Sequence, residues 1–132
     1  MALVRIEILA GRSPEEKRQL LDAVHDGLVA ALHVPPGDAT LRVVEHRPED
    51  VALPTWPRPV GDRYTLIEIT MFSGRSAAAK RELYRELVRR LGELGTPEPD
   101  VTVVLVESPP ESWGVRGGRP ASEVELGFRV DV

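Results

Sequence analysis

Arg75 is the residue of this sequence whose type and position best suit the binding of a small anion. It directly precedes Ser76, a typical N-cap residue, and the apolar positions that follow recur with the spacing of one helix face. A helix N-terminus stabilises negative charge, and a guanidinium binds a carboxylate through two parallel hydrogen bonds. We therefore predict that Arg75 binds a carboxylate. Arg12 precedes the first predicted helix in the same way, and there we interpret it as a solvated or interface arginine.

Other kinds of site chemistry find no support in the sequence. The 132 residues include no Cys, which excludes disulfides, thiolate catalysis and thiolate metal ligands. His25, His33 and His46 lack metal-ligand spacing, and we predict a structural role for each. The glycines within residues 114–118 do not open a helix, so they are not a phosphate-binding loop. We expect neither a metal nor a cofactor.

The composition favours a globular protein that acts on small molecules. Hydrophobic residues make up 42% of the chain, and the net charge of −4 comes without a dense basic stripe, which argues against nucleic-acid binding. Arg5 and Glu7 interrupt the apolar N-terminal stretch, and no run approaches the ~18 apolar residues of a membrane span. We expect a cytoplasmic protein with one domain over residues 1–132.

An internal repeat predicts the architecture. Gly11–Ser13 and Lys17–Arg18 recur 63 residues later as Gly74–Ser76 and Lys80–Arg81. Further pairs stand 62 residues apart: Asp38 with Asp100, Val44-Glu45 with Val106-Glu107, and Glu49 with Glu111. Each copy opens with an alternating strand and continues with a helix that Ser13 or Ser76 caps. Each closes with a strand, at residues 40–45 and 101–106.

These elements predict an α+β fold in which two tandem β-α-β units form a four-stranded sheet with two helices on one face. Repeat 1 covers about residues 2–48 and repeat 2 about 64–111, joined by a proline-rich loop at about 46–63. A hairpin and strand occupy about residues 112–132. Apolar residues alternate over residues 123–132, which predicts a strand that pairs with the sheet edge of a neighbouring subunit.

Several segments together resemble the malonate semialdehyde decarboxylase branch of the tautomerase superfamily. The most specific is residues 20–27, Leu-Leu-Asp-Ala-Val-His-Asp-Gly. The others are Val34-Pro35, Asp38, Val44-Glu45-His46, Ser73-Gly74-Arg75, Leu83-Tyr84 and Trp113, so the match spans nearly the whole chain. The resemblance implies fused β-α-β units, a tautomerase-like fold, a homotrimer and a small oxo-acid or enol ligand.

The resemblance also implies roles for individual residues. In the family, removal of the initiator Met exposes a proline whose secondary amine is the acid or base; here Ala2 stands at that position. Asp38 matches the aspartate that activates water or polarises the substrate, although an Asp after Pro35-Pro36-Gly37 could also cap a turn. The family pattern has two arginines before the second helix, of which Arg75 is the second. Trp113 and Phe72 are candidate pocket residues; Trp113 could equally pack at a subunit interface.

Two functions are compatible with these residues. One is a tautomerase-like protein that binds a small oxo acid or enol but has weak or no proline-dependent activity. The other is an active tautomerase, decarboxylase or hydratase on a small carboxylate. It would use the Ala2 amine as acid or base, with Asp38 and Arg75. Which one applies depends on whether Met1 is removed.

Overall fold

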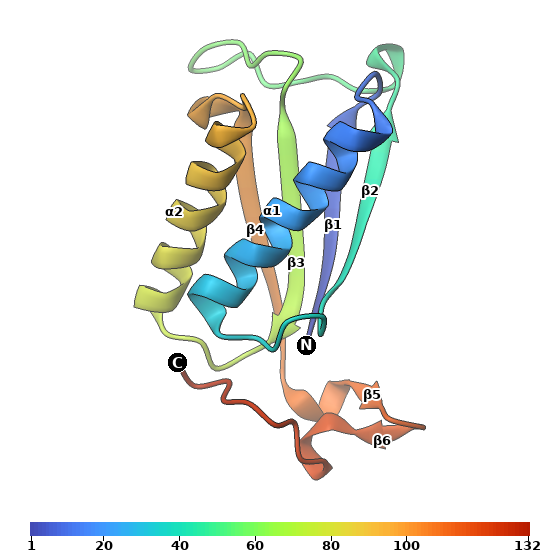
Figure 1. Cartoon of the computed structure of the whole chain (residues 1–132), viewed down its shortest axis with the longest axis vertical. Helices are drawn as coiled ribbons and strands as arrows, with labels where there is room; N and C mark the ends of the chain where they lie inside the picture. The colour runs from blue at the N-terminus through green and yellow to red at the C-terminus, as the bar shows by residue number, and fades with distance from the viewer.

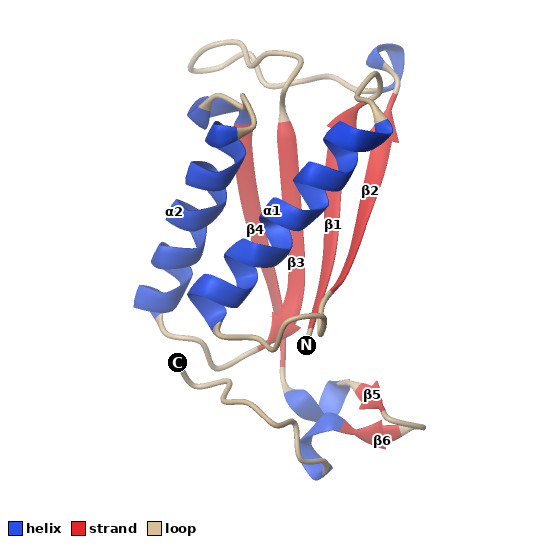
Figure 2. Ribbon diagram, in the orientation of Figure 1, coloured by secondary structure: helices blue, strands red, loops and turns tan.

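The computed structural model describes all residues from Met1 to Val132 and shows a two-layer arrangement of helices against a sheet (Figures 1 and 2). The four strands of the sheet lie in the order β2-β1-β3-β4. Their bounds are β1 Ala2–Leu9, β2 Thr40–His46, β3 Thr65–Phe72 and β4 Val101–Ser108. Helices α1 (Pro14–Leu32) and α2 (Ala77–Glu93) cover one face, as predicted.

The strand pairing reflects the repeat. β1 pairs with β2 in parallel, and β3 pairs with β4 in parallel, so each copy is a β-α-β unit. The two units meet through the central strands β1 and β3, which are antiparallel and place Ala2 opposite Met71. As a consequence, the start of the first unit lies beside the end of β3.

The two helices begin in related but unequal ways. Ser13 accepts a hydrogen bond from the Glu16 N–H at 3.1 Å, and the Glu16 side chain accepts from the Ser13 N–H at 3.2 Å, which completes a capping box. Ser76 accepts from the Ala79 N–H at 3.0 Å, but Ala79 has no side chain to return the bond. Neither helix combines the length and hydrophobicity that would allow it to cross a membrane.

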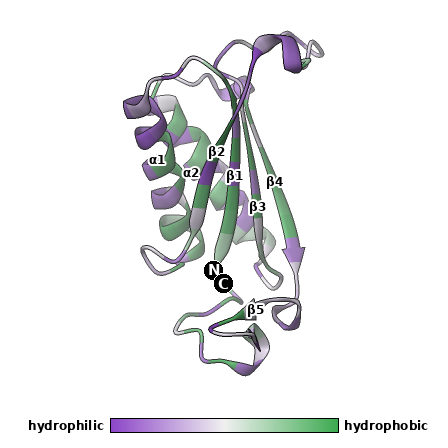
Figure 3. Ribbon diagram, turned by 90° about the vertical axis from the view of Figure 1, so that its right-hand side faces the viewer, coloured by the Kyte–Doolittle hydropathy of each residue, from purple (hydrophilic) through white to green (hydrophobic).

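The core lies between the helices and one face of the sheet. Inward residues of β1 and β3 alternate with more exposed ones, as the period-two pattern predicts, and the helices bury a leucine-rich stripe against them. The helices also touch each other where Gly27 of α1 faces Leu87 of α2. No helix covers the opposite face of the sheet, where Val104 and Val106 are 42% and 43% exposed (Figure 3).

The C-terminal part contains the predicted hairpin, with β5 (Gly114–Val115) antiparallel to β6 (Arg119–Pro120). Residues 123–132 pair with no strand of their own chain: a 3₁₀ turn at Ala121–Glu123 is followed by backbone outside any sheet. Their pairing with a neighbouring subunit stays a prediction. The alternation nevertheless has a structural basis, because its even-numbered apolar residues are half-buried against Phe72 and Val115 of the same chain.

Glycine at position 27 allows the close approach of α1 to α2. A Cβ at Gly27 would lie 2.9 Å from Leu87 Cδ2, whereas a Cβ at Gly92, also helical, would meet no atom within 4 Å. Both Gly→Ala changes gain the same helix propensity, so their difference isolates the contact. We expect Gly27→Ala to be less stable than Gly92→Ala by about 1–3 kcal/mol. Urea denaturation measures this difference, and equal midpoints would show that the helices separate freely.

Candidate functional site

The terminal amino group forms an ion pair with Asp38. Met1 directly precedes β1, and its amino nitrogen lies 2.8 Å from Asp38 Oδ2. That oxygen is buried and has no hydrogen-bond partner apart from this amine. The side chains of Met1 and Asp38 are 33% and 28% exposed, so the pair sits at the edge of the core rather than in open solvent. An amine and a carboxylate are thereby held in direct contact.

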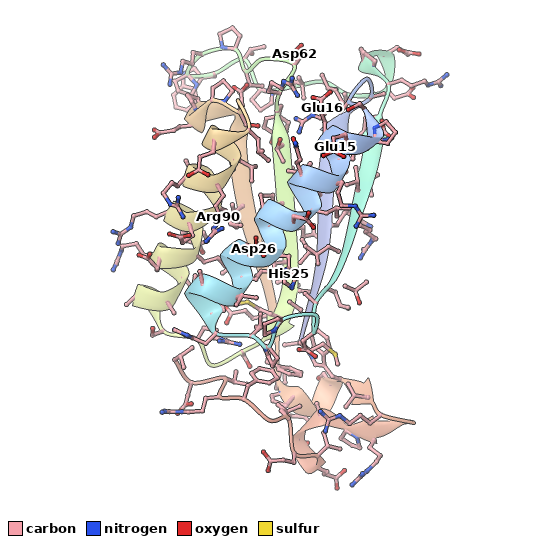
Figure 4. The ribbon with its side chains drawn as sticks, viewed as in Figure 1. Glu15, Glu16, His25, Asp26, Asp62 and Arg90 are labelled. Carbon is pink, nitrogen blue, oxygen red and sulfur yellow. The ribbon has the colours of Figure 1, made fainter.

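The loop before β2 directs Asp38 toward the amine. The Asp38 N–H donates to the Pro35 carbonyl at 3.1 Å, so the turn is closed by main-chain atoms and the carboxylate is left available. Gly37, at φ +84°, donates its N–H to His25 Nε2 at 3.0 Å. Because Nε2 accepts, the His25 proton lies on Nδ1, which is 3.0 Å from Asp26 Oδ1 (Figure 4).

The hydrogen bond to Gly37 gives His25 a structural contact with the loop that carries Asp38. The only sequence signal of this contact was the place of His25 within residues 20–27, the segment most specific to the family. The bond to Gly37 joins residues 12 apart in the chain and cannot be inferred from helical spacing.

Arg75 lies at the end of the loop between β3 and α2 and is only 7% exposed. It donates to the main-chain carbonyl of Leu32, in the last turn of α1, and its buried Nε has no acceptor. A guanidinium that is more than nine-tenths buried with an unmatched donor is unusual, because such groups are normally paired. Arg75 thus retains hydrogen-bonding capacity for an anion.

The three charged groups influence one another. Burial is the main cause that lowers the pKa of the Met1 amine below its ordinary 8.0; Asp38 opposes this shift and Arg75 adds to it. Burial also lowers the pKa of Arg75, but a guanidinium remains protonated in proteins. The amine is therefore closer to neutrality at physiological pH than an exposed one, which suits proton transfer.

Aromatic and aliphatic side chains close the site on its outer side. The rings of Phe72 and Trp113 meet edge to face with centroids 4.7 Å apart, and the Trp113 indole N–H donates to Ser108 Oγ at 2.8 Å. Met1 and the tail, which we define as residues 124–132, pack against the same cluster. None of the five cavities of the structure borders Met1, Asp38 or Arg75.

The predicted residues are thus placed in two groups. Asp38 raises and Arg75 lowers the pKa of the terminal amine. Phe72 and Trp113 belong to the hydrophobic cluster against which Met1 packs. Ala2, predicted to supply the amine, is 1% exposed and follows Met1, whose nitrogen is the one in contact with Asp38.

The related residues of the other repeat lie at the opposite end of the sheet and are bonded differently. Arg12, interpreted from the sequence as solvated or at an interface, donates to the Arg63 carbonyl at 3.0 Å and to Thr65 Oγ1 at 3.2 Å, and its buried Nε has no acceptor. A cavity of about 240 Å³ adjoins it, and Glu16 and Asp62 contribute negative charge there (Figure 4). Because Arg12 and Arg63 line the same cavity, positive and negative side chains are mixed at this end.

Comparison with known proteins agrees with this geometry. A family model described as tautomerase enzyme matches residues 38–116, and a second with the same description matches residues 3–54. The chain belongs to the tautomerase family. Probable tautomerase YrdN of Bacillus subtilis is 29% identical over 115 residues, covering 86% of this chain and 89% of that relative. Probable tautomerase RSp0893 of Ralstonia nicotianae is 38% identical over 53 residues, covering 39% of this chain and 76% of that relative.

Solved structures show the same tautomerase fold over nearly the whole chain. A malonate semialdehyde decarboxylase superposes with a TM-score of 0.81 at 29% identity, covering 89% of this chain and 93% of that one. A fused 4-OT that forms a symmetric trimer gives 0.79 at 28% identity, with coverages of 91% and 96%. The decarboxylase branch is therefore represented among the structural neighbours of this chain.

The charge cluster makes a prediction about the terminal amine. Asp38→Asn should lower the pKa of the amine further, because the carboxylate stabilises its charged form, whereas Arg75→Gln should raise it. The chemical shift of the ¹⁵N-labelled amine against pH measures both changes.

Stability should follow the same shifts. The amine of the unfolded chain binds more protons between the lowered pKa and 8.0, so this group makes the free energy of unfolding rise with pH across that window. Shifts of equal sign in Asp38→Asn and Arg75→Gln would contradict the contacts described.

Proposed function

We propose that this tautomerase-family protein binds a small oxo acid or its enol beside the terminal amine, and that its proline-dependent tautomerase or decarboxylase activity is weak or absent. The observation that carries the proposal is the buried Arg75 with its unmatched Nε, next to an amine and a carboxylate that are 2.8 Å apart. The guanidinium would bind the ligand carboxylate. The amine would face the oxo or enol group, and Asp38 would receive or return a proton.

The weakness of the activity follows from the kind of amine. Ala2 stands where the resemblance expects proline, so the chain offers a primary amine instead of a cyclic secondary one. With Met1 in place, the amine also lies one residue beyond that position and is engaged by Asp38. A ligand must compete with this ion pair before it can exchange a proton with the amine.

A homotrimer is part of the proposal. The fused 4-OT that shares 28% of its residues with this chain is a symmetric trimer, and the sheet face without helices offers apolar surface for assembly, including Val104 and Val106. We propose a cytoplasmic location as well, as expected from the sequence.

The second candidate is an active tautomerase, decarboxylase or hydratase whose amine belongs to Ala2. One observation favours it: Ala2 is 1% exposed, so removal of Met1 would place a primary amine in an apolar setting that lowers its pKa. Such an amine can act as a base or form an imine with a carbonyl. Intact mass separates the two forms, and borohydride trapping with pyruvate reports the imine as a mass adduct on the N-terminal residue.

Binding of a carboxylate tests the first proposal directly. Arg75→Gln should weaken binding of pyruvate at least tenfold, because a charge-assisted hydrogen bond contributes about 1.5–3 kcal/mol. Arg12→Gln makes the same change at the opposite end of the sheet and should leave pyruvate binding unaltered. Calorimetric titration of folded proteins measures both. Equal affinity of the Arg75→Gln variant and the parent chain would refute the proposal.

Replacement of Ala2 by proline tests the activity. Ala2→Pro, with Met1 removed, should create or raise tautomerase activity toward the enol of phenylpyruvate, since it supplies a secondary amine at the start of β1, a position that tolerates proline. The same change combined with Arg75→Gln should lose the gain. An unchanged rate in Ala2→Pro would mean that the site lacks more than the proline.

A further inference from the structure

The main-chain N–H groups that precede the two helices have different acceptors. In the first repeat, the Ser13 N–H is bonded by Glu16, three residues on in the same helix. In the second repeat the corresponding residue is Ala79, and the Ser76 N–H donates instead to the main-chain oxygen of Val132 at 2.9 Å. Because Ala79 has no side-chain acceptor, the Ser76 N–H has no capping-box partner and can donate to an oxygen from outside the helix.

This donor belongs to the same residue pair as the guanidinium of the site. Ser76 follows Arg75, whose side chain is 7% exposed and whose buried Nε has no acceptor. The first turn of α2 contains no acidic residue, and the 17-residue helix directs the positive end of its dipole toward this point. Consecutive residues before α2 thus carry one unmatched and one replaceable donor beside a helix N-terminus, where negative charge is stabilised.

The tail occupies this place through few polar contacts. Val130 packs on the loop before α2, where its Cγ1 lies 3.4 Å from the position a Cβ would take at Gly74. The apolar side chains of the tail are half-buried, and beyond the preceding 3₁₀ turn two hydrogen bonds join it to the rest of the chain, from the Ser76 N–H to the Val132 oxygen and from Arg116 to the Glu125 carbonyl. Both termini lie at this end of the sheet, with the C-terminal segment below it (Figures 1 and 3).

We propose that the Ser76 N–H is a carboxylate-binding donor of the site and that the Val132 oxygen is its internal competitor, so that a ligand carboxylate binds Arg75 and Ser76 by displacing the tail. The inference rests on the proposed function of the same site. It explains why no cavity borders Arg75: the tail holds the place that the ligand takes. It also assigns a role to Ala79, where an acidic or amide side chain would close the donor.

Restoring the capping box tests the donor. Ala79→Gln supplies a neutral acceptor for the Ser76 N–H, as Gln can at this position of a capping box. We expect pyruvate to bind about three- to tenfold more weakly. Ala78→Gln places the same amide in the same helical turn outside the capping position and should leave the affinity unchanged. Glu16→Ala opens the corresponding box in the first repeat and should leave the affinity unchanged.

Releasing the tail tests the competitor. A chain without residues 124–132 should bind pyruvate about three- to tenfold more tightly, because the ligand no longer has to replace a hydrogen bond. Val130→Asn, which loosens the tail in the full-length chain, should act in the same direction if the shortened chain folds poorly. In the parent chain, the Ser76 amide signal in ¹H–¹⁵N spectra should shift on titration with pyruvate.

The outcomes separate this inference from the proposed function. If Arg75→Gln loses pyruvate while Ala79→Gln and the tail variants bind like the parent chain, the site binds carboxylates but Ser76 and the tail have no part in it. If Arg75→Gln binds normally, the proposed function itself fails. Weaker binding in Ala79→Gln together with tighter binding in the tail variants is the result that supports the inference.

Discussion

The antiparallel pairing of β1 with β3 is the constraint on which the site depends. Within each repeat the strands are parallel, so a repeat alone would keep the start of its first strand far from the loop before its own helix. The central antiparallel pair places Ala2 opposite Met71 and thereby brings the terminal amine of one repeat to the Arg75 loop of the other. The site is a product of the fusion: one repeat supplies the amine and Asp38, and the other supplies the guanidinium.

The same symmetry places an equivalent set of residues at the other end of the sheet, where the chemistry has diverged. Asp100, the counterpart of Asp38, is 5% exposed and accepts from the Gly61 N–H, because here the chain continues and no terminal amine exists. Arg12 donates to the carbonyl of Arg63 and to the Thr65 hydroxyl, although its buried Nε, like that of Arg75, has no acceptor. The two ends therefore differ in the partner of the aspartate, which is the Gly61 N–H for Asp100 and the terminal amine for Asp38. Chain continuity at the linker accounts for this division, since only one of the two strands can begin with a free amine.

The sequence predicted the scaffold well because its signals are local. The serine caps, the alternation in the first strand of each repeat and the repeat itself each depend on residues close in the chain or on simple periodicity, and together they led to the sheet and helix layers that the structure shows. Residues 123–132 show the limit of such signals. Alternation reports which side chains are buried, and the even-numbered apolar residues there are half-buried; it does not report which strand, if any, receives the backbone hydrogen bonds.

The contacts of the site lay beyond such signals. The bond from Gly37 to His25, the approach of Arg75 to the Leu32 carbonyl and the ion pair of Met1 with Asp38 join segments that only the tertiary fold brings together. The sequence around Arg12 is similar to that around Arg75, and it correctly predicted that both residues precede a helix. It did not predict which groups each guanidinium contacts. One acceptor of Arg12 is the hydroxyl of Thr65, the first residue of β3. The first residue of β1 is Ala2, whose side chain has no atom that could accept a hydrogen bond.

The surroundings of the terminal amine can be separated from the effect of having Ala2 where the resemblance expects a proline. Burial is the largest influence on the amine, followed by the opposing action of Asp38 and the reinforcing charge of Arg75, and all three come from the surroundings of the nitrogen. Burial and Arg75 would lower the pKa of any amine at this place, and Asp38 would raise it. What a primary amine changes is its intrinsic basicity and its readiness to form an imine. The residue at the chain start therefore determines the type of amine, whereas its surroundings determine how its pKa is shifted.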